Sequence, residues 1–319
     1  MKSYQELSVC LDKRVWEIAK ISEHVPFTGL MTGKTGIAIL LYHYARFKNE
    51  PALLAYADRL LELTLQEINP LLGKGFDEGL SGIAWGFNYL IKNEFIQVDE
   101  DFLEDIDAVL FQDEDNSLEF WDLNTESEKG LYLLSRIDFS TSAEDDIWRE
   151  RLEKCVQNLR NILMHKYTHH ELLVYPCRTL IRFFYVCRAL RGIEPYRPAL
   201  DALFNELTEI VNISFHEEKN VCDKLLLASM LTGFPVFERC YIFSDVPPEM
   251  TLPDVMKYYL TLLFFDQSIS IPEAVEKTFL SSLIEQRYPL SNPLSPYNAG
   301  LHYHGRLDWS LFMYLRPRT

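Results

Sequence analysis

The sequence lacks several features that would assign it to a common class. None of its six cysteines form a Cys-x-x-Cys pair, so a structural zinc knot of that kind is not expected. No apolar run reaches the roughly 18 residues that a membrane span needs, and Met1 is not followed by a signal-peptide-like run. We therefore expect a cytoplasmic protein whose cysteines are mostly free thiols in the core.

Signals for β-strands are also scarce. Few segments alternate apolar and polar residues, and tight Asn-Gly or Asp-Gly turns are few. Apolar residues make up 48% of the 319 residues and aromatic residues 13%, which is ample for a packed core. The sequence therefore predicts an all-α protein, organised as a single domain over residues 1–319.

The chain has fewer positively charged residues than negatively charged ones. The chain has 31 lysines and arginines against 47 aspartates and glutamates, which gives a formal net charge of −16. A surface of this sign disfavours a nucleic-acid backbone or an anionic membrane as a partner. It favours neutral or basic ligands only slightly, because acidic surfaces are also an ordinary aid to solubility.

Two glycine-rich turns, each followed by an apolar helix, are the most informative stretches. Residues 29–48 place Gly29, Gly33 and Gly36 ahead of an apolar run, and residues 75–93 repeat the pattern. The first turn is not a phosphate-binding loop, because three residues separate Gly29 from Gly33 where that motif needs four. A glycine turn that leads into a buried helix is the better interpretation.

The pattern recurs along the chain. With unit starts at Gly33, Gly82, Gly130, Pro176 and Cys222, the intervals are 49, 48, 46 and 46 residues. Each unit pairs a nearly all-apolar helix with an amphipathic one, which suits a buried inner layer and a half-exposed outer layer. The sequence therefore predicts an α/α toroid of about six to seven helical hairpins, with Ile37–Phe47 and Ile83–Ile91 on the inner ring.

Further helices are expected from the same periodicity. They cover residues 6–21, 51–68, 100–110, 130–136, 145–165, 175–187, 198–212, 222–231, 252–265 and 272–286.

The turns GLMTGKTGIAILLYHYAR and FDEGLSGIAWGFNYL resemble the repeat turns of lanthionine synthetase C-like (LanC-like) proteins. The resemblance is strong over residues 27–93, weak over 128–290 and partial again over 299–315. It implies an α/α toroid of about seven hairpins. In the cyclases of that family it also implies a central zinc ion, which activates a peptide cysteine for thioether formation.

The zinc ligands of those cyclases come from C-Y-G-like and C-H-G-like turns. This chain has no C-Y-G triplet, and Tyr303-His304-Gly305 stands where a C-H-G turn is expected. The resemblance leaves Cys177, Cys222 and His304 as the metal ligands, with His302 as an alternative to His304. It also implies catalytic roles for Asp77, as an acid/base group, and for His304. The missing triplets indicate a degenerate zinc site.

Three functions stay open at this point. The chain is either a LanC-like cyclase that matures a peptide, or a non-catalytic relative that binds a peptide or protein partner. The third function, from another class, is a carbohydrate-active α/α barrel, which needs two carboxylates about 5 to 9 Å apart. The candidate carboxylates for that chemistry are Asp77, Glu78, Glu128 and Asp223.

Overall fold

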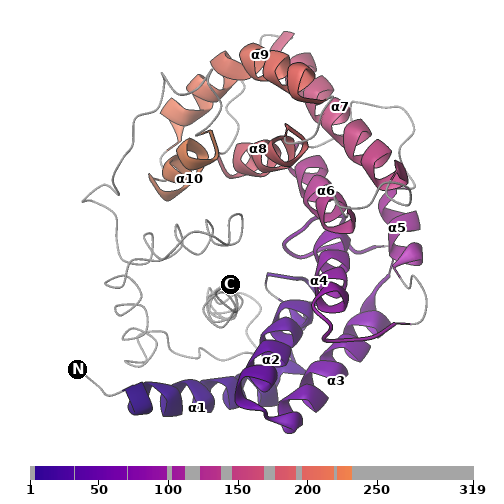
Figure 1. Cartoon of the computed structure of the whole chain (residues 1–319), viewed down its shortest axis with the longest axis vertical. Coiled ribbons are helices and arrows are strands. Elements are labelled where there is room, and N and C mark those ends of the chain that lie inside the picture. Colours follow the sequence, from indigo (N-terminus) through magenta and orange to yellow (C-terminus); the bar gives the residue numbers. More distant parts are fainter. Residues whose placement is uncertain are drawn as a thin grey trace. The chain divides into compact units, whose positions relative to one another are not determined.

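The computed structural model describes residues 4–31, 33–69, 71–98, 103–111, 123–137, 146–168, 177–191, 196–218 and 221–231 (Figure 1). Every regular element within these residues is an α-helix, which confirms the predicted all-α class for this part of the chain. The helices fall into two compact units, α1 to α5 within Met1–Asp113 and α6 to α10 within Glu114–Asp266. The single domain over residues 1–319 stays a prediction.

The first unit is built on a helical hairpin. Helix α2 packs against α3, against α4 of the next hairpin, and against α1, which also contacts α3. Helix α4 in turn packs against α5, so α3 and α5 cover α2 and α4 (Figure 1). The bounds are α1 (Tyr4–Ser22), α2 (Lys34–Lys48), α3 (Pro51–Glu67), α4 (Leu80–Lys92) and α5 (Glu104–Phe111).

The second unit continues the same scheme. Helices α6, α8 and α10 contact one another in series, while α7 packs on α6 and α8 and α9 packs on α8 (Figure 1). The bounds are α6 (Leu123–Arg136), α7 (Asp146–Thr168), α8 (Cys177–Arg191), α9 (Tyr196–Glu217) and α10 (Val221–Leu231). Each unit therefore has two layers of helices.

The layers differ in burial as the sequence predicts. All residues of α2 from Lys34 to Ala45 are buried, and α4 is buried at every position from Leu80 to Leu90 except Trp85. Helix α3 is amphipathic and buries only a stripe with helical spacing, namely Leu53, Ala57, Leu60, Leu61 and Thr64. The alternation of an enclosed helix with an amphipathic one is confirmed for α2 and α3.

Three details of the sequence prediction are wrong. Helix α4 begins at Leu80, before Gly82, and α6 begins at Leu123, so Gly130 lies inside that helix and does not start it. Phe47 was placed in the buried run but is 60% exposed, because it lies in the last turn of α2 beyond the packed segment. The helices expected over residues 252–265 and 272–286 lie outside the described residues.

Candidate functional site

The two glycine turns are held by the same pattern of hydrogen bonds. Lys34 opens α2 and donates its backbone N–H to Phe27 O at 2.9 Å, while Leu80 opens α4 and donates to Gly73 O at 2.9 Å. Each of these bonds reaches seven residues back along the chain. In each turn, the next residue adds a hydroxyl bond that also reaches seven residues back. Thr35 Oγ1 donates to Thr28 O at 2.6 Å, and Ser81 Oγ donates to Lys74 O at 2.5 Å. We call this pair of backbone and hydroxyl bonds the turn lock.

These equivalent bonds fix the register of the repeat. From Lys34 to Leu80 the interval is 46 residues, which corrects the 49 residues obtained by pairing Gly33 with Gly82. Along the sequence, the helices α6, α8 and α10 of the second unit begin at Leu123, Cys177 and Val221, at successive intervals of 43, 54 and 44 residues counted from Leu80. The two described glycine turns therefore share their hydrogen bonds, whereas the spacing of the helix starts varies along the chain.

The glycines of the turns are required by close backbone contacts. A Cβ at Gly29 would lie 2.5 Å from Glu78 Cα in the other turn, and a Cβ at Gly82 would collide with Phe76 O. Gly33 has an extended conformation, with φ −129° and ψ −169°, and its Cβ would collide with the backbone of Gly29. Gly33 and Gly82 are therefore required because a side chain at either position has no space.

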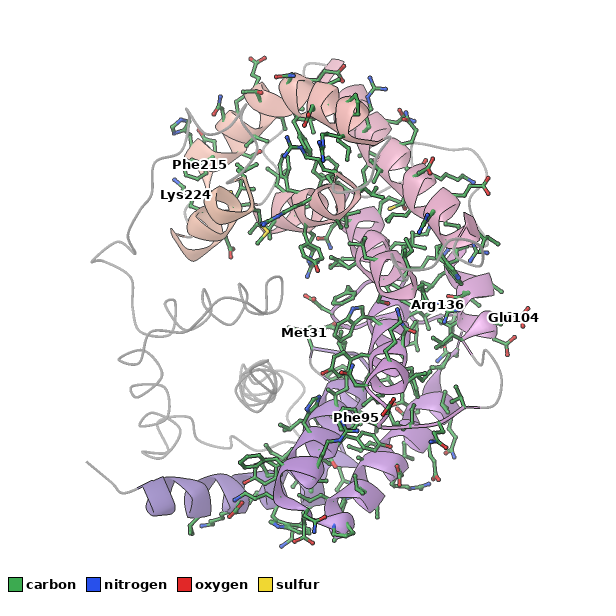
Figure 2. All side chains as sticks on the ribbon, in the orientation of Figure 1. Met31, Phe95, Glu104, Arg136, Phe215 and Lys224 are labelled. Atoms are coloured by element: carbon green, nitrogen blue, oxygen red, sulfur yellow. The ribbon has the colours of Figure 1, made fainter. Side chains whose placement is uncertain are left out.

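Asp77 lies where the two turns meet. Met31, labelled in Figure 2, donates its backbone N–H to Asp77 O at 2.8 Å. The Asp77 side chain is half-buried and stands two residues before Gly79, which precedes α4. The backbone of Asp77 thus joins the first repeat to the second, and the acid/base role of its carboxylate stays a prediction.

Lys34 serves the packing of α2 on α3. Its ammonium binds both carboxylate oxygens of Glu67, at 2.8 and 2.7 Å, and its side chain is 3% exposed. In a phosphate-binding loop the lysine would extend toward the phosphates. The contact with Glu67 gives Lys34 a structural role.

Cys177 is the first residue of α8, as the sequence predicts, and it is completely buried. Its backbone N–H donates to Glu218 Oε2 at 3.2 Å, and its Sγ lies 3.8 Å from Ser214 O. Burial raises the pKa of the thiol to about 12, helped by Glu218 and Asp223. Without a metal ion, Cys177 is therefore a thiol at neutral pH.

The first turn of α10 lies beside this thiol. Lys224 lowers the pKa of Cys177, which opposes Asp223, and α8 packs against α10. Lys224, labelled with Phe215 in Figure 2, places its ammonium 5.5 Å from the Phe215 ring centre. The structure thus brings together the two helix starts that carry Cys177 and Cys222.

Only part of the predicted zinc site lies within the residues that the structure describes. The side chain of Cys222 and all of His304, with its alternative His302, lie outside the described part of the molecule. Among the described residues, no group of three or more His, Cys, Asp and Glu side chains is placed to hold a metal ion. One protonated, buried thiol does not by itself fit zinc, which needs about three protein ligands in a catalytic site. The role of Cys177, Cys222 and His304 as metal ligands stays a prediction.

A buried polar network across the first turns of α6 and α8 was missed by sequence reasoning. The Glu128 carboxylate forms an ion pair with Arg182, and the two side chains are 6% and 8% exposed. Asn124 connects them, since its Nδ2 donates to Glu128 at 2.9 Å and its Oδ1 accepts from Arg182 at 3.2 Å. Thr179 Oγ1 also donates to Asn124 Oδ1, at 3.3 Å.

A second buried cluster connects α6 with α7. Lys129 lies 3.7 Å from Glu126, and Asn158 Nδ2 donates to the Glu126 carboxylate at 3.2 Å. Cys155 Sγ donates to Glu126 O at 3.3 Å, and burial raises the pKa of that thiol. The signal in the sequence was the run of polar residues from Asn124 to Lys129, which comes directly before the apolar part of α6. Hydropathy alone predicts that such a polar run is exposed to solvent.

The network bears on the carbohydrate-active alternative. A catalytic acid of that class must reach a glycosidic oxygen. The carboxylate of Glu128 is held by Arg182 and Asn124 in the core, which suits a structural role better. Glu78 is exposed, whereas Asp77 and Asp223 are half-buried.

No helix in the described residues is both long and apolar enough to cross a membrane. In comparisons with known proteins, no family model, curated protein or solved structure matches this chain.

Proposed function

We propose that the chain is a divergent LanC-like protein that forms an α/α toroid and binds a peptide without the zinc chemistry of the cyclases. The observation that carries the proposal is the repeated turn lock, in which two glycine turns close by the same bonds seven residues back. The glycine turns carry the family resemblance. Their shared geometry therefore supports an interpretation as true repeats of one architecture.

The proposed peptide site is formed by the starts of α8 and α10. The half-buried side chains of Asp223 and Lys224 lie there beside the enclosed Cys177. Both signs of charge are present, so the site can pair with a backbone terminus or with a charged side chain. The positive ends of the two helix dipoles add attraction for carboxylates.

The proposal is tested by selecting peptides from a random twelve-residue library on the full chain, followed by calorimetry of the enriched peptides. We expect Asp223→Asn combined with Lys224→Gln to weaken binding about tenfold, the effect of losing about 1.4 kcal/mol. The control variant is Arg160→Gln with Glu206→Gln, which removes an exposed pair of opposite charges 3.3 Å apart on α7 and α9. Both variants leave the net charge unchanged.

Binding that is insensitive to Asp223 and Lys224, or equally weakened by the control, would place the site elsewhere. Failure to enrich any peptide over an unrelated acidic protein would overturn the function itself.

A further inference from the structure

We propose that Asn124 extends the peptide site from the starts of α8 and α10 to the start of α6, where its carboxamide binds a backbone carbonyl of the peptide. This role of Asn124 rests on the peptide-binding function proposed above. Asn124 is the second residue of α6, and its Oδ1 accepts a hydrogen bond from Thr179 Oγ1, in the first turn of α8, at 3.3 Å. The two helix starts are therefore adjacent, and α8 packs in turn against α10.

The hydrogen bonds of Asn124 fix the orientation of its carboxamide. Arg182 can only donate hydrogen bonds and the Glu128 carboxylate can only accept them, so Oδ1 must face the guanidinium and Nδ2 the carboxylate. The distances are 3.2 Å from Arg182 Nη1 to Oδ1 and 2.9 Å from Nδ2 to Glu128 Oε1. Because both ends of the amide are held, it cannot flip.

One donor of Asn124 is left for a ligand. Its Nδ2 carries two hydrogens, and within the described residues only one of them has a partner, the Glu128 carboxylate. The Asn124 side chain is half-buried, so part of it meets solvent, whereas Glu128, Arg182 and Thr179 are buried. Asn124 is therefore the residue through which this buried network can reach a bound molecule.

The buried charges behind Asn124 indicate a purpose beyond stability. Burying Glu128 and Arg182 costs desolvation energy, and packed apolar residues in place of a buried ion pair often leave a protein equally stable or more stable. A buried network that holds a partly exposed polar side chain in one orientation is what a binding site needs. A peptide backbone fits the remaining donor, because every residue of a peptide supplies a carbonyl acceptor. Asn124 thus binds the backbone, while Asp223 and Lys224 pair with charged groups.

The test is a double-mutant cycle between the full chain and a peptide enriched in the selection described above. Each backbone amide of that peptide is replaced by an ester, one position at a time, because an ester carbonyl is a weaker acceptor. Asn124→Leu keeps the size of the side chain and removes its donors. We expect one ester position to weaken binding to the parent chain about tenfold by calorimetry, and binding to Asn124→Leu by less than about twofold.

Two further variants separate binding from a change in structure. Asn205→Leu makes the same replacement at an exposed asparagine on α9, and we expect its affinity to stay within about twofold of the parent. Thr179→Val keeps the donor of Asn124 but removes one of the bonds that hold it, and we expect the ester penalty to fall to about threefold. This variant takes the place of Asn124→Leu in the cycle if circular dichroism shows Asn124→Leu to be unfolded.

Failure of this role can be told apart from failure of the function. If Asp223→Asn with Lys224→Gln weakens binding and Asn124→Leu does not, the peptide site stands and the role of Asn124 is wrong. Equal ester penalties in the parent and in Asn124→Leu would also overturn that role, because the carboxamide would then not contact the backbone. If no peptide is enriched, the function and the role of Asn124 are both wrong.

Discussion

Buried polar side chains in this protein differ in how well they are satisfied. Thr35 is completely buried and donates its hydroxyl to Thr28 O at 2.6 Å, within the first turn lock. Thr64 is equally buried on the inner face of α3, but its Oγ1 has no hydrogen-bond partner among the described residues. A buried hydroxyl without a partner costs stability, whereas one in a good bond contributes to it.

The two threonines therefore give a matched pair of predictions. Thr64→Val should leave the free energy of unfolding unchanged or raise it by up to about 1 kcal/mol, because it removes an unsatisfied oxygen from the core. Thr35→Val should lower it by about 1–2 kcal/mol, because Thr28 O loses a bond. Urea denaturation measures both. A larger loss for Thr64→Val than for Thr35→Val would show that the assignment of these two hydroxyls is wrong.

Cys177 predicts a dependence of stability on alkaline pH. Burial raises its pKa from the ordinary 9.0 to about 12, so the folded state holds this proton more tightly than the unfolded state does. The contribution is fully present below pH 9 and is lost as the pH rises toward 12.

Cys177→Ala should therefore flatten the decline in the free energy of unfolding between pH 8 and pH 11 by about 1–2 kcal/mol. Denaturation of both proteins at the two pH values gives the comparison. The other titrating groups are common to both and cancel. Parallel declines in the two proteins would contradict the raised pKa.

At the scale of elements, the turn lock explains which parts of the fold were predictable. The apolar run after Gly33 and the stripe of α3 follow from helical periodicity, and both were predicted. The register of the repeat was predicted wrongly, because three glycines at similar spacing in each turn allow more than one alignment. Only the backbone bonds from Lys34 to Phe27 and from Leu80 to Gly73 distinguish them.

The start of α6 was missed for a related reason. The predicted helix over residues 130–136 leaves out four polar residues that lie in the first turns of α6 and pair with α7 and α8, namely Asn124, Glu126, Glu128 and Lys129. Charge pairing between helices that are distant in sequence leaves no trace in local periodicity. Gly130, which was predicted to start a unit, instead allows close packing inside α6, since a Cβ there would lie 3.0 Å from Val186 Cγ2.

The close packing of the second turn predicts that Gly82 and Gly73 differ in how well they tolerate substitution by alanine. Gly82→Ala should lower the free energy of unfolding by about 1–3 kcal/mol, because the added Cβ collides with Phe76 O and lies 3.0 Å from Leu30 Cβ. Gly73→Ala is the control, since a Cβ there meets nothing within 4 Å, and it should change stability by no more than about 0.5 kcal/mol. Thermal or chemical denaturation of the two variants tests this, and equal tolerance would argue against close packing of the turns.

At the scale of the whole molecule, each unit repeats one plan of an enclosed helix covered by a partner helix. This plan was predictable from the alternation of apolar and amphipathic segments. Closure into a toroid, which the repeat and the family resemblance predict, is not tested by the described residues and stays part of the proposal. The metal ligands were inferred from the family resemblance, and of these only the buried thiol of Cys177 is described.

We propose that this chain keeps a LanC-like repeat for binding a peptide and lacks the zinc-dependent reaction of the cyclases. The most direct measurement is the zinc content of the full chain, purified without added zinc or chelator, by elemental mass spectrometry. We expect far less than one zinc ion per chain. A content near one zinc ion per chain, retained through gel filtration and lost on replacing Cys177, Cys222 or His304, would contradict it and restore the cyclase interpretation.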